Sequence, residues 1–164
     1  MRTPAQRGVG VEERHKPALT GVPPAWLSGL VLAGANRPPG QDRDDGYLTA
    51  KEIASLDLTC CDLVLLSASE TAVGTQRGGE GMLSVRRALR EAGAGTVIAS
   101  LWKVRDEETR RLVTDFYERL WTEGASPLPA LRDAQLALLA ENRRRGLGPR
   151  PFTWGAFVLS GEWR

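Results

Sequence analysis

Two apolar segments with a helical stretch between them constrain the fold of this chain more than any other feature. The apolar segments are residues 62–67 and 96–101. Continuous apolar runs of this length are typical of strands in parallel sheets, which are buried on both faces. In residues 80–92, apolar side chains recur at helical spacing, at Val85, Ala88, Leu89 and Ala92. Because parallel strands need a crossover connection, residues 62–101 predict a right-handed parallel strand-helix-strand unit.

The residues before this unit predict little further core. Residues 29–33 are a short strand candidate. Thr49 and Glu52 form a capping-box pattern, because each side chain can satisfy a free backbone donor, and a short helix is expected to follow. Residues 36–45, with two prolines and alternating charges, predict an exposed loop. Residues 1–24 are rich in Gly, Pro, Arg and Glu without helical or strand periodicity, so we expect a poorly ordered arm there.

The residues after the unit predict two long helices and a last strand. Gly93 is placed to end the crossover helix, and Asp106 can cap a long helix that ends before Gly124. Its expected apolar face is Val113, Phe116, Tyr117 and Leu120. A second long helix is expected over residues 127–142 and a strand over residues 156–160. Together, the expected elements predict an α/β layered domain with about four strands and four helices.

Length and charge narrow the classes of protein and partner. The chain has 164 residues, of which 41% are apolar and 26% charged, a normal balance for one globular domain. Its net charge of +2 gives no argument for nucleic acid or anionic membrane as a partner, and we expect neither. The longest lipophilic stretch, residues 26–35, is about half of a membrane span. Since the amino terminus lacks the apolar core of a secretory signal, a cytoplasmic location is expected.

The two cysteines of the chain give no sign of a disulfide or a metal. Cys60 and Cys61 are adjacent, so they cannot form a framework disulfide, and they offer too few ligands for a structural zinc site. We expect them to be small buried residues at the start of a strand. No residue pattern indicates a metal or an organic cofactor, and none is predicted.

The polar residues that follow the first apolar strand are the best candidates for a catalytic site. Ser69 would lie just past the strand end, where backbone N–H groups can form an oxyanion hole. Its surroundings lack the flanking glycines of a serine-hydrolase nucleophile elbow. The glycines of residues 74–79 have the separation of a phosphate loop, but Glu80 and Gly81 stand where lysine and a hydroxyl residue should be. A nucleotide site is therefore not expected.

Seven ordered blocks of this sequence resemble one known family, the CHAT domain, over roughly residues 25–162. The CHAT domain is a caspase-like peptidase module that is often joined to tetratricopeptide repeats. The blocks are residues 26–36, 46–52, 56–58, 63–71, 79–81, 100–104 and 154–161.

The resemblance implies an α/β, caspase-like three-layer domain with a mostly parallel sheet. Residues 25–164 would then be the carboxyl-terminal part of a CHAT domain, with the family's amino-terminal strands missing. Without them the sheet would have an exposed edge, which predicts association with a repeat-protein partner or with the missing amino-terminal segment. A peptide or protein is the implied substrate.

The resemblance also implies a cysteine-histidine dyad that cleaves peptide bonds. Ser69 occupies the position of the cysteine, and the neighbouring Glu70 and Thr71 become candidate substrate-binding residues. His15 is the only histidine in the chain and therefore the only candidate for the dyad. The family's histidine follows an apolar strand and precedes a glycine, and His15 has neither neighbour.

Three interpretations of function follow. The leading one is a CHAT-family domain that is catalytically defective, because a serine hydroxyl lacks the nucleophilicity of a thiolate. The second is an active peptidase, either with a true serine nucleophile or with an engineered cysteine-to-serine replacement at Ser69. The third is a peptide-binding or regulatory interaction module that cleaves nothing.

Overall fold

The structure is a computed structural model that describes residues 26, 28–33, 35, 45–67 and 80–162, with backbone only for residues 80–82. The arm expected over residues 1–24, most of the loop expected over residues 36–45 and the glycine-rich residues 74–79 lie outside the described residues. The elements run in chain order as β1 (Gly29–Val31), β2 (Tyr47–Thr49), α2 (Ala50–Ala54), β3 (Leu63–Leu66), α3 (Glu80–Glu91), β4 (Thr96–Ser100), α4 (Asp106–Trp121), α5 (Pro127–Arg144), α6 (Pro151–Trp154) and β5 (Phe157–Gly161).

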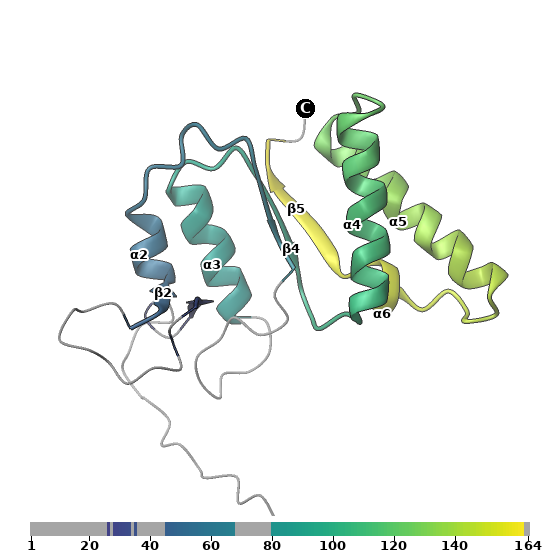
Figure 1. The fold of residues 1–164 in the computed structure, drawn as a ribbon, viewed down its shortest axis with the longest axis horizontal. Helices are drawn as coiled ribbons and strands as arrows, with labels where there is room; N and C mark the ends of the chain where they lie inside the picture. The colour runs from purple at the N-terminus through teal and green to yellow at the C-terminus, as the bar shows by residue number, and fades with distance from the viewer. Residues whose placement is uncertain (1–25, 27, 34, 36–44, 68–79, 163–164) are drawn as a thin grey trace, which may run out of the picture.

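The main sheet has the strand order β3-β4-β5 and lies between two layers of helices (Figure 1). Helices α2 and α3 cover one face, and α4 and α5 cover the other. β3 pairs with β4 in parallel, from Leu63 opposite Thr96 to Leu66 opposite Ala99. The expected α/β class, its layers and the parallel pairing of residues 62–101 are therefore confirmed.

β5 runs antiparallel to β4, with Phe157 opposite Ser100, so the sheet is mixed. The reason lies in the helices between the two strands. α4 leads the chain away from the carboxyl end of β4, and α5 brings it back to the same end, where α6 precedes β5 (Figure 1). A strand that starts at that end must run against β4.

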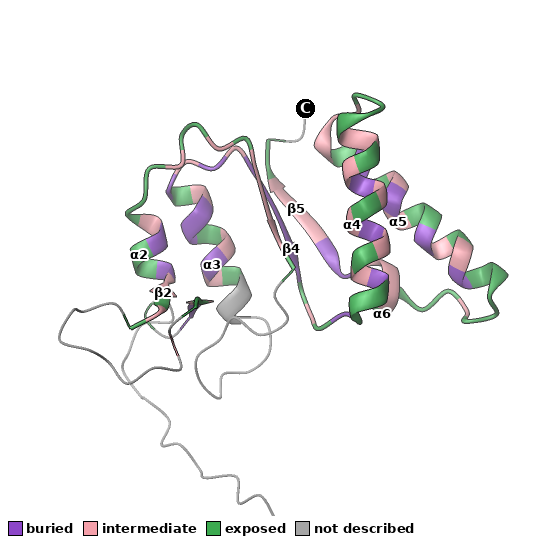
Figure 2. Ribbon diagram, in the orientation of Figure 1, coloured by how far each residue is buried: buried purple, intermediate pink, exposed green. Residues whose placement is uncertain are grey.

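The sheet separates two apolar cores, and β4 contributes to both of them (Figure 2). All five residues of β4 are buried. On the side of α4 and α5 the buried members are Ile98, Val104, Leu112, Phe116, Ala130, Leu131, Ala134, Leu138, Ala156 and Phe157. On the side of α2 and α3 they are Ala50, Ile53, Val85, Ala88, Leu89, Ala94 and Val97.

β3 is an edge strand among the described residues, although its sequence is that of a central strand. It has one neighbour, β4, and each of its four residues is only partly buried. Leu63 and Leu65 pack on one core, and Val64 and Leu66 pack on the other. Natural edge strands usually carry a charge, a proline or a bulge that prevents pairing, and β3 has neither charge nor proline.

The local signals at two helix ends are confirmed. Thr49 and Glu52 form the capping box of α2: the Thr49 N–H donates to Glu52 Oε2 at 2.7 Å, and the Glu52 N–H donates to Thr49 Oγ1 at 3.3 Å. Gly93 follows the end of α3 with φ of +104°. Its N–H donates to the Arg90 carbonyl and the Ala94 N–H to the Leu89 carbonyl, both at 3.1 Å, which is the Schellman pattern.

Two expectations about individual residues are wrong, and a third is confirmed in part. Cys60 is exposed and Cys61 only partly buried, because both lie in the turn before β3 rather than in the strand. Asp106 is the first residue of α4 rather than its cap, since the extended backbone of Arg105 takes the cap position. Of the expected apolar face of α4, Phe116 is fully buried, and Tyr117 and Leu120 pack against the same core while partly buried. The other buried residues of α4 are Glu108 and Leu112.

Candidate functional site

The carboxyl ends of β3 and β4 form the frame of the candidate site. Ser67 follows β3 and is exposed, and Ser100 ends β4 with 4% of its surface exposed. Because Leu66 lies opposite Ala99, the next residues of the two parallel strands are Ser67 and Ser100. The same end of the sheet is where the following helices start (Figure 1).

The predicted site residues themselves lie outside the described part of the chain. Ser69, Glu70 and Thr71 follow the last residue of β3 by three to five positions, so their attachment to the frame is known and their side chains are not described. His15 lies in the undescribed residues 1–25.

An aromatic pair forms one wall of the frame. Trp102, just after β4, stacks on Phe152 of α6, with ring centroids 5.8 Å apart and an interplanar angle of 16°. The Trp102 indole N–H also donates to the Phe152 carbonyl at 2.9 Å. Phe152 keeps 56% of its surface exposed and Leu101 keeps 43%. This wall offers apolar contact to a bound molecule, and its two partners lie too far apart in the sequence for any local pattern to reveal it.

Carboxylates occupy the first turn of α4, beside the same end of the sheet. Asp106, Glu107 and Glu108 complement the positive end of the helix dipole. Hydrogen bonds from Arg111 and then Arg110 hold the pKa of the Glu107 carboxyl below its usual range. Asp106 and Glu107 are exposed and form a charged rim, and they belong to the helix start rather than to any bound group.

Glu108 is a buried carboxylate that the sequence analysis missed. It is 9% exposed, its Oε2 lies 3.7 Å from Arg105 Nε, and that oxygen accepts no hydrogen bond. A signal for its burial is present in the sequence, because Glu108 precedes Leu112 and Phe116 at steps of four residues along one helix face. The spacing was not recognised because Glu108 is charged and was not counted with the apolar residues of the face.

The described residues contain neither a metal-binding cluster nor a helix able to span a membrane. No group of three or more His, Cys, Asp or Glu side chains there is placed to hold a metal ion. Among the described helices, none combines the length and the apolar character needed to cross a bilayer.

Comparison with known families decides the assignment of this frame. The sequence model of the CHAT domain matches residues 21–162, which is most of the chain. The chain belongs to the CHAT domain family. The match includes both apolar cores and the carboxyl ends of β3 and β4, so this CHAT domain has the α/β architecture expected of a caspase-like, peptidase-type module. A comparison with curated individual proteins found no match.

Proposed function

We propose that this CHAT domain binds peptides at the carboxyl ends of β3 and β4 without cleaving them. The observation that carries the proposal is the residue at the family's nucleophile position, which is Ser69 instead of cysteine. A cysteine is partly ionised near neutral pH and intrinsically very nucleophilic, whereas a serine hydroxyl needs a well-placed general base.

The histidine of the chain supports the same proposal. A general base must come within about 2.6–3.2 Å of the hydroxyl from which it takes the proton. His15 lies among Val11, Glu12, Glu13, Arg14 and Lys16. It lacks the apolar strand and the following glycine that set the family's histidine in place, so Ser69 has no base that the sequence identifies.

The proposed peptide contacts lie on both sides of the frame. Glu70 and Thr71 follow Ser69 directly and are the proposed substrate-binding residues. Trp102 and Phe152 supply an apolar wall for a side chain of the peptide. We place this activity in the cytoplasm, with peptide or protein partners and no nucleic acid.

Restoring the thiol tests the proposal. We expect neither the natural chain nor Ser69→Cys to hydrolyse a mixed library of fluorogenic peptides above the rate of Ser69→Ala, because the substitution supplies a nucleophile and no base. Peptides bound by the natural chain should be retained by Ser69→Ala with unchanged affinity. Hydrolysis that appears in Ser69→Cys and disappears in Ser69→Cys/His15→Ala would show an intact dyad. Hydrolysis by the natural chain that Ser69→Ala abolishes would show a serine peptidase.

The open edge of β3 supports a second proposal, about partners. We propose that residues 25–164 are the carboxyl-terminal part of the domain and that a further strand pairs with β3, from an amino-terminal segment or a repeat-protein partner. Two observations support this proposal: the four side chains of β3 are aliphatic and partly buried, and among the described residues β3 has a strand partner on one side only.

The oligomeric state of the chain in solution tests whether β3 pairs with a further strand. The chain of 164 residues is expected to elute in size-exclusion chromatography with light scattering as species larger than a monomer, in proportions that rise with concentration. A folded monomer that stays monodisperse up to high concentration would contradict the proposal, since the edge would then be stable without a partner.

A further inference from the structure

The β1-β2 hairpin presents an apolar face to solvent. Leu30 lies opposite Leu48, and both pack toward the core of α2 and α3. Since side chains alternate along a strand, the neighbouring positions face outward. The exposed fractions on and beside the hairpin are Trp26 52%, Val31 58%, Leu32 51% and Tyr47 39%. This concentration of exposed apolar side chains on one short hairpin is the mark of an interaction site.

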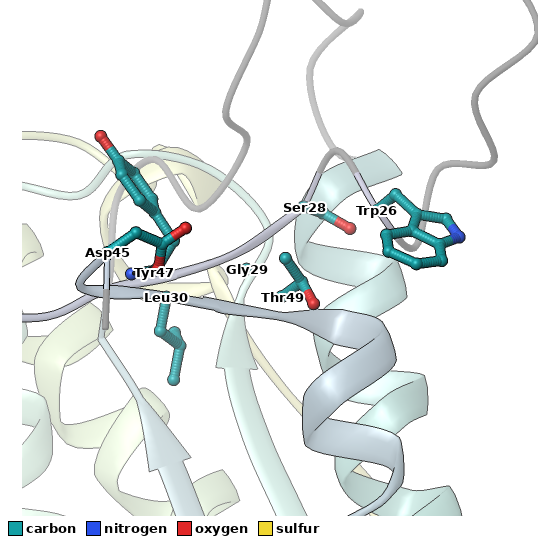
Figure 3. Close-up of a pocket in the computed structure, with 7 residues that line it drawn as sticks. All are labelled: Trp26, Ser28, Gly29, Leu30, Asp45, Tyr47 and Thr49. Atoms are coloured by element: carbon teal, nitrogen blue, oxygen red, sulfur yellow. Dashed lines mark hydrogen bonds between the residues drawn. The ribbon is translucent and has the colours of Figure 1, made fainter. Parts of the chain in front are cut away.

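A small pocket lies along the hairpin. Its volume is about 200 Å³, and it is lined by Trp26, Ser28, Gly29, Leu30, Asp45, Tyr47 and Thr49. In Figure 3, Trp26 lies at one end, Tyr47 and Asp45 lie at the other, and Gly29 lies between them. A Cβ atom at position 29 would come within 2.3 Å of the Leu48 carbonyl oxygen, so main chain alone fits at this position. Sites for whole small molecules are usually about 300–1,000 Å³, so this pocket suits a single side chain.

The two ends of the pocket carry opposite charges. At the Tyr47 end, Asp45 Oδ1 accepts a hydrogen bond from the Tyr47 N–H at 2.9 Å, which fixes the carboxylate beside the ring. At the Trp26 end, Lys51 Nζ lies 3.8 Å from the centroid of the indole ring. A ligand that spans the pocket is therefore matched by a positive group near Asp45 and a negative group near Lys51.

The pocket lies on the same end of the molecule as the candidate site. The hairpin sits beside the first turns of α3, where β3 and β4 end (Figure 1). Leu30 and Leu48 share a core with Leu66, the last residue of β3. The hairpin and the ends of the two strands therefore lie at the same end of the protein.

We propose that this pocket is a second contact for the bound peptide. It takes one apolar side chain over Gly29, with a basic residue of the peptide on the Asp45 side and an acidic residue on the Lys51 side. The inference rests on the proposed function for the class of ligand, a peptide, and adds to it the two opposite charges that the peptide must carry on either side of the apolar side chain.

Three labelled peptides test this charge pairing on the natural chain. The probes are fluorescein-labelled Arg-Gly-Leu-Gly-Glu, Arg-Gly-Leu-Gly-Arg and Arg-Gly-Gly-Gly-Glu, measured by fluorescence polarisation. We expect the leucine peptide with one basic and one acidic end to bind roughly tenfold more tightly than the leucine peptide with two basic ends, and the leucine-free peptide to bind more weakly than the first. Equal affinity for the two leucine peptides, or binding of neither, overturns the inference.

Variants then locate the binding. The variant Lys51→Asp should reverse the preference between the two leucine peptides, because both ends of the pocket are then negative, and Trp26→Ala should weaken the preferred one by about tenfold. Trp121→Ala, which changes an exposed tryptophan on α4, is the control and should leave both affinities unchanged. A preference that survives Lys51→Asp overturns the assignment to this pocket. Hydrolysis by Ser69→Cys would instead overturn the proposed lack of cleavage and leave the peptide preference standing.

Discussion

Replacing Phe116 by alanine is expected to lower the free energy of unfolding by about 3–5 kcal/mol, which is a large part of the stability of a domain of this size. Phe116 is fully buried at the centre of the core between the sheet and helices α4 and α5. Its ring meets Tyr117 edge to face, with centroids 5.1 Å apart. Removing the ring loses both the buried apolar surface and these contacts, and leaves a cavity that the surrounding helices fill only in part.

Urea unfolding followed by circular dichroism measures this loss, and Trp121 of the same helix provides the control. Trp121 is larger than Phe116 but 75% exposed, and its ring stacks on Tyr117 with centroids 4.3 Å apart. Trp121→Ala should therefore cost about 1 kcal/mol or less. Equal losses in the two variants would mean that α4 is not anchored through its Phe116 face, and the layer order of the fold would have to be revised.

The parts of the fold that sequence analysis predicted are those that local pattern determines. Residues 62–101 alternate between an apolar strand, an amphipathic helix and a second apolar strand, and each segment is long enough to display its period. β2 escaped prediction because three residues show no period and because it forms through pairing with β1. The antiparallel direction of β5 was not predicted for a similar reason. It follows from the two helices that precede it, which no window within residues 156–160 contains.

Part of the candidate site could also be predicted from local pattern, and part of it could not. The strand that precedes Ser69 could be located from its apolar run. The chemistry expected of Ser69 follows from its residue type. The aromatic wall could not be located, because Trp102 and Phe152 are brought together by the path of α4, α5 and α6. The hairpin pocket could not be located either, since it depends on the register that places Gly29 opposite Thr49.

Gly93→Ala is expected to cost about 2–4 kcal/mol, and it tests how firmly the turn between α3 and β4 is held. At φ of +104°, an alanine is strained in the backbone by about 1–2 kcal/mol. Its Cβ would also meet Thr59 Cγ2 at 2.9 Å and the Thr59 backbone nitrogen at 3.1 Å. Overpacking of this kind adds about 1–3 kcal/mol.

Gly124 separates the two contributions, because it has the same sign of φ without the crowding. It follows α4 with φ of +69°, and a Cβ there would meet nothing within 4 Å. Gly124→Ala should therefore show the backbone strain alone, about 1–2 kcal/mol, in the same urea experiment. The difference between the two variants then measures the contact with Thr59, which fastens the segment before β3 to the end of α3. If the two losses are equal, Thr59 yields freely to the added methyl group, and the segment before β3 is held to the end of α3 by other contacts, such as the hydrogen bond from the Leu58 N–H to the Ala92 carbonyl at 2.8 Å.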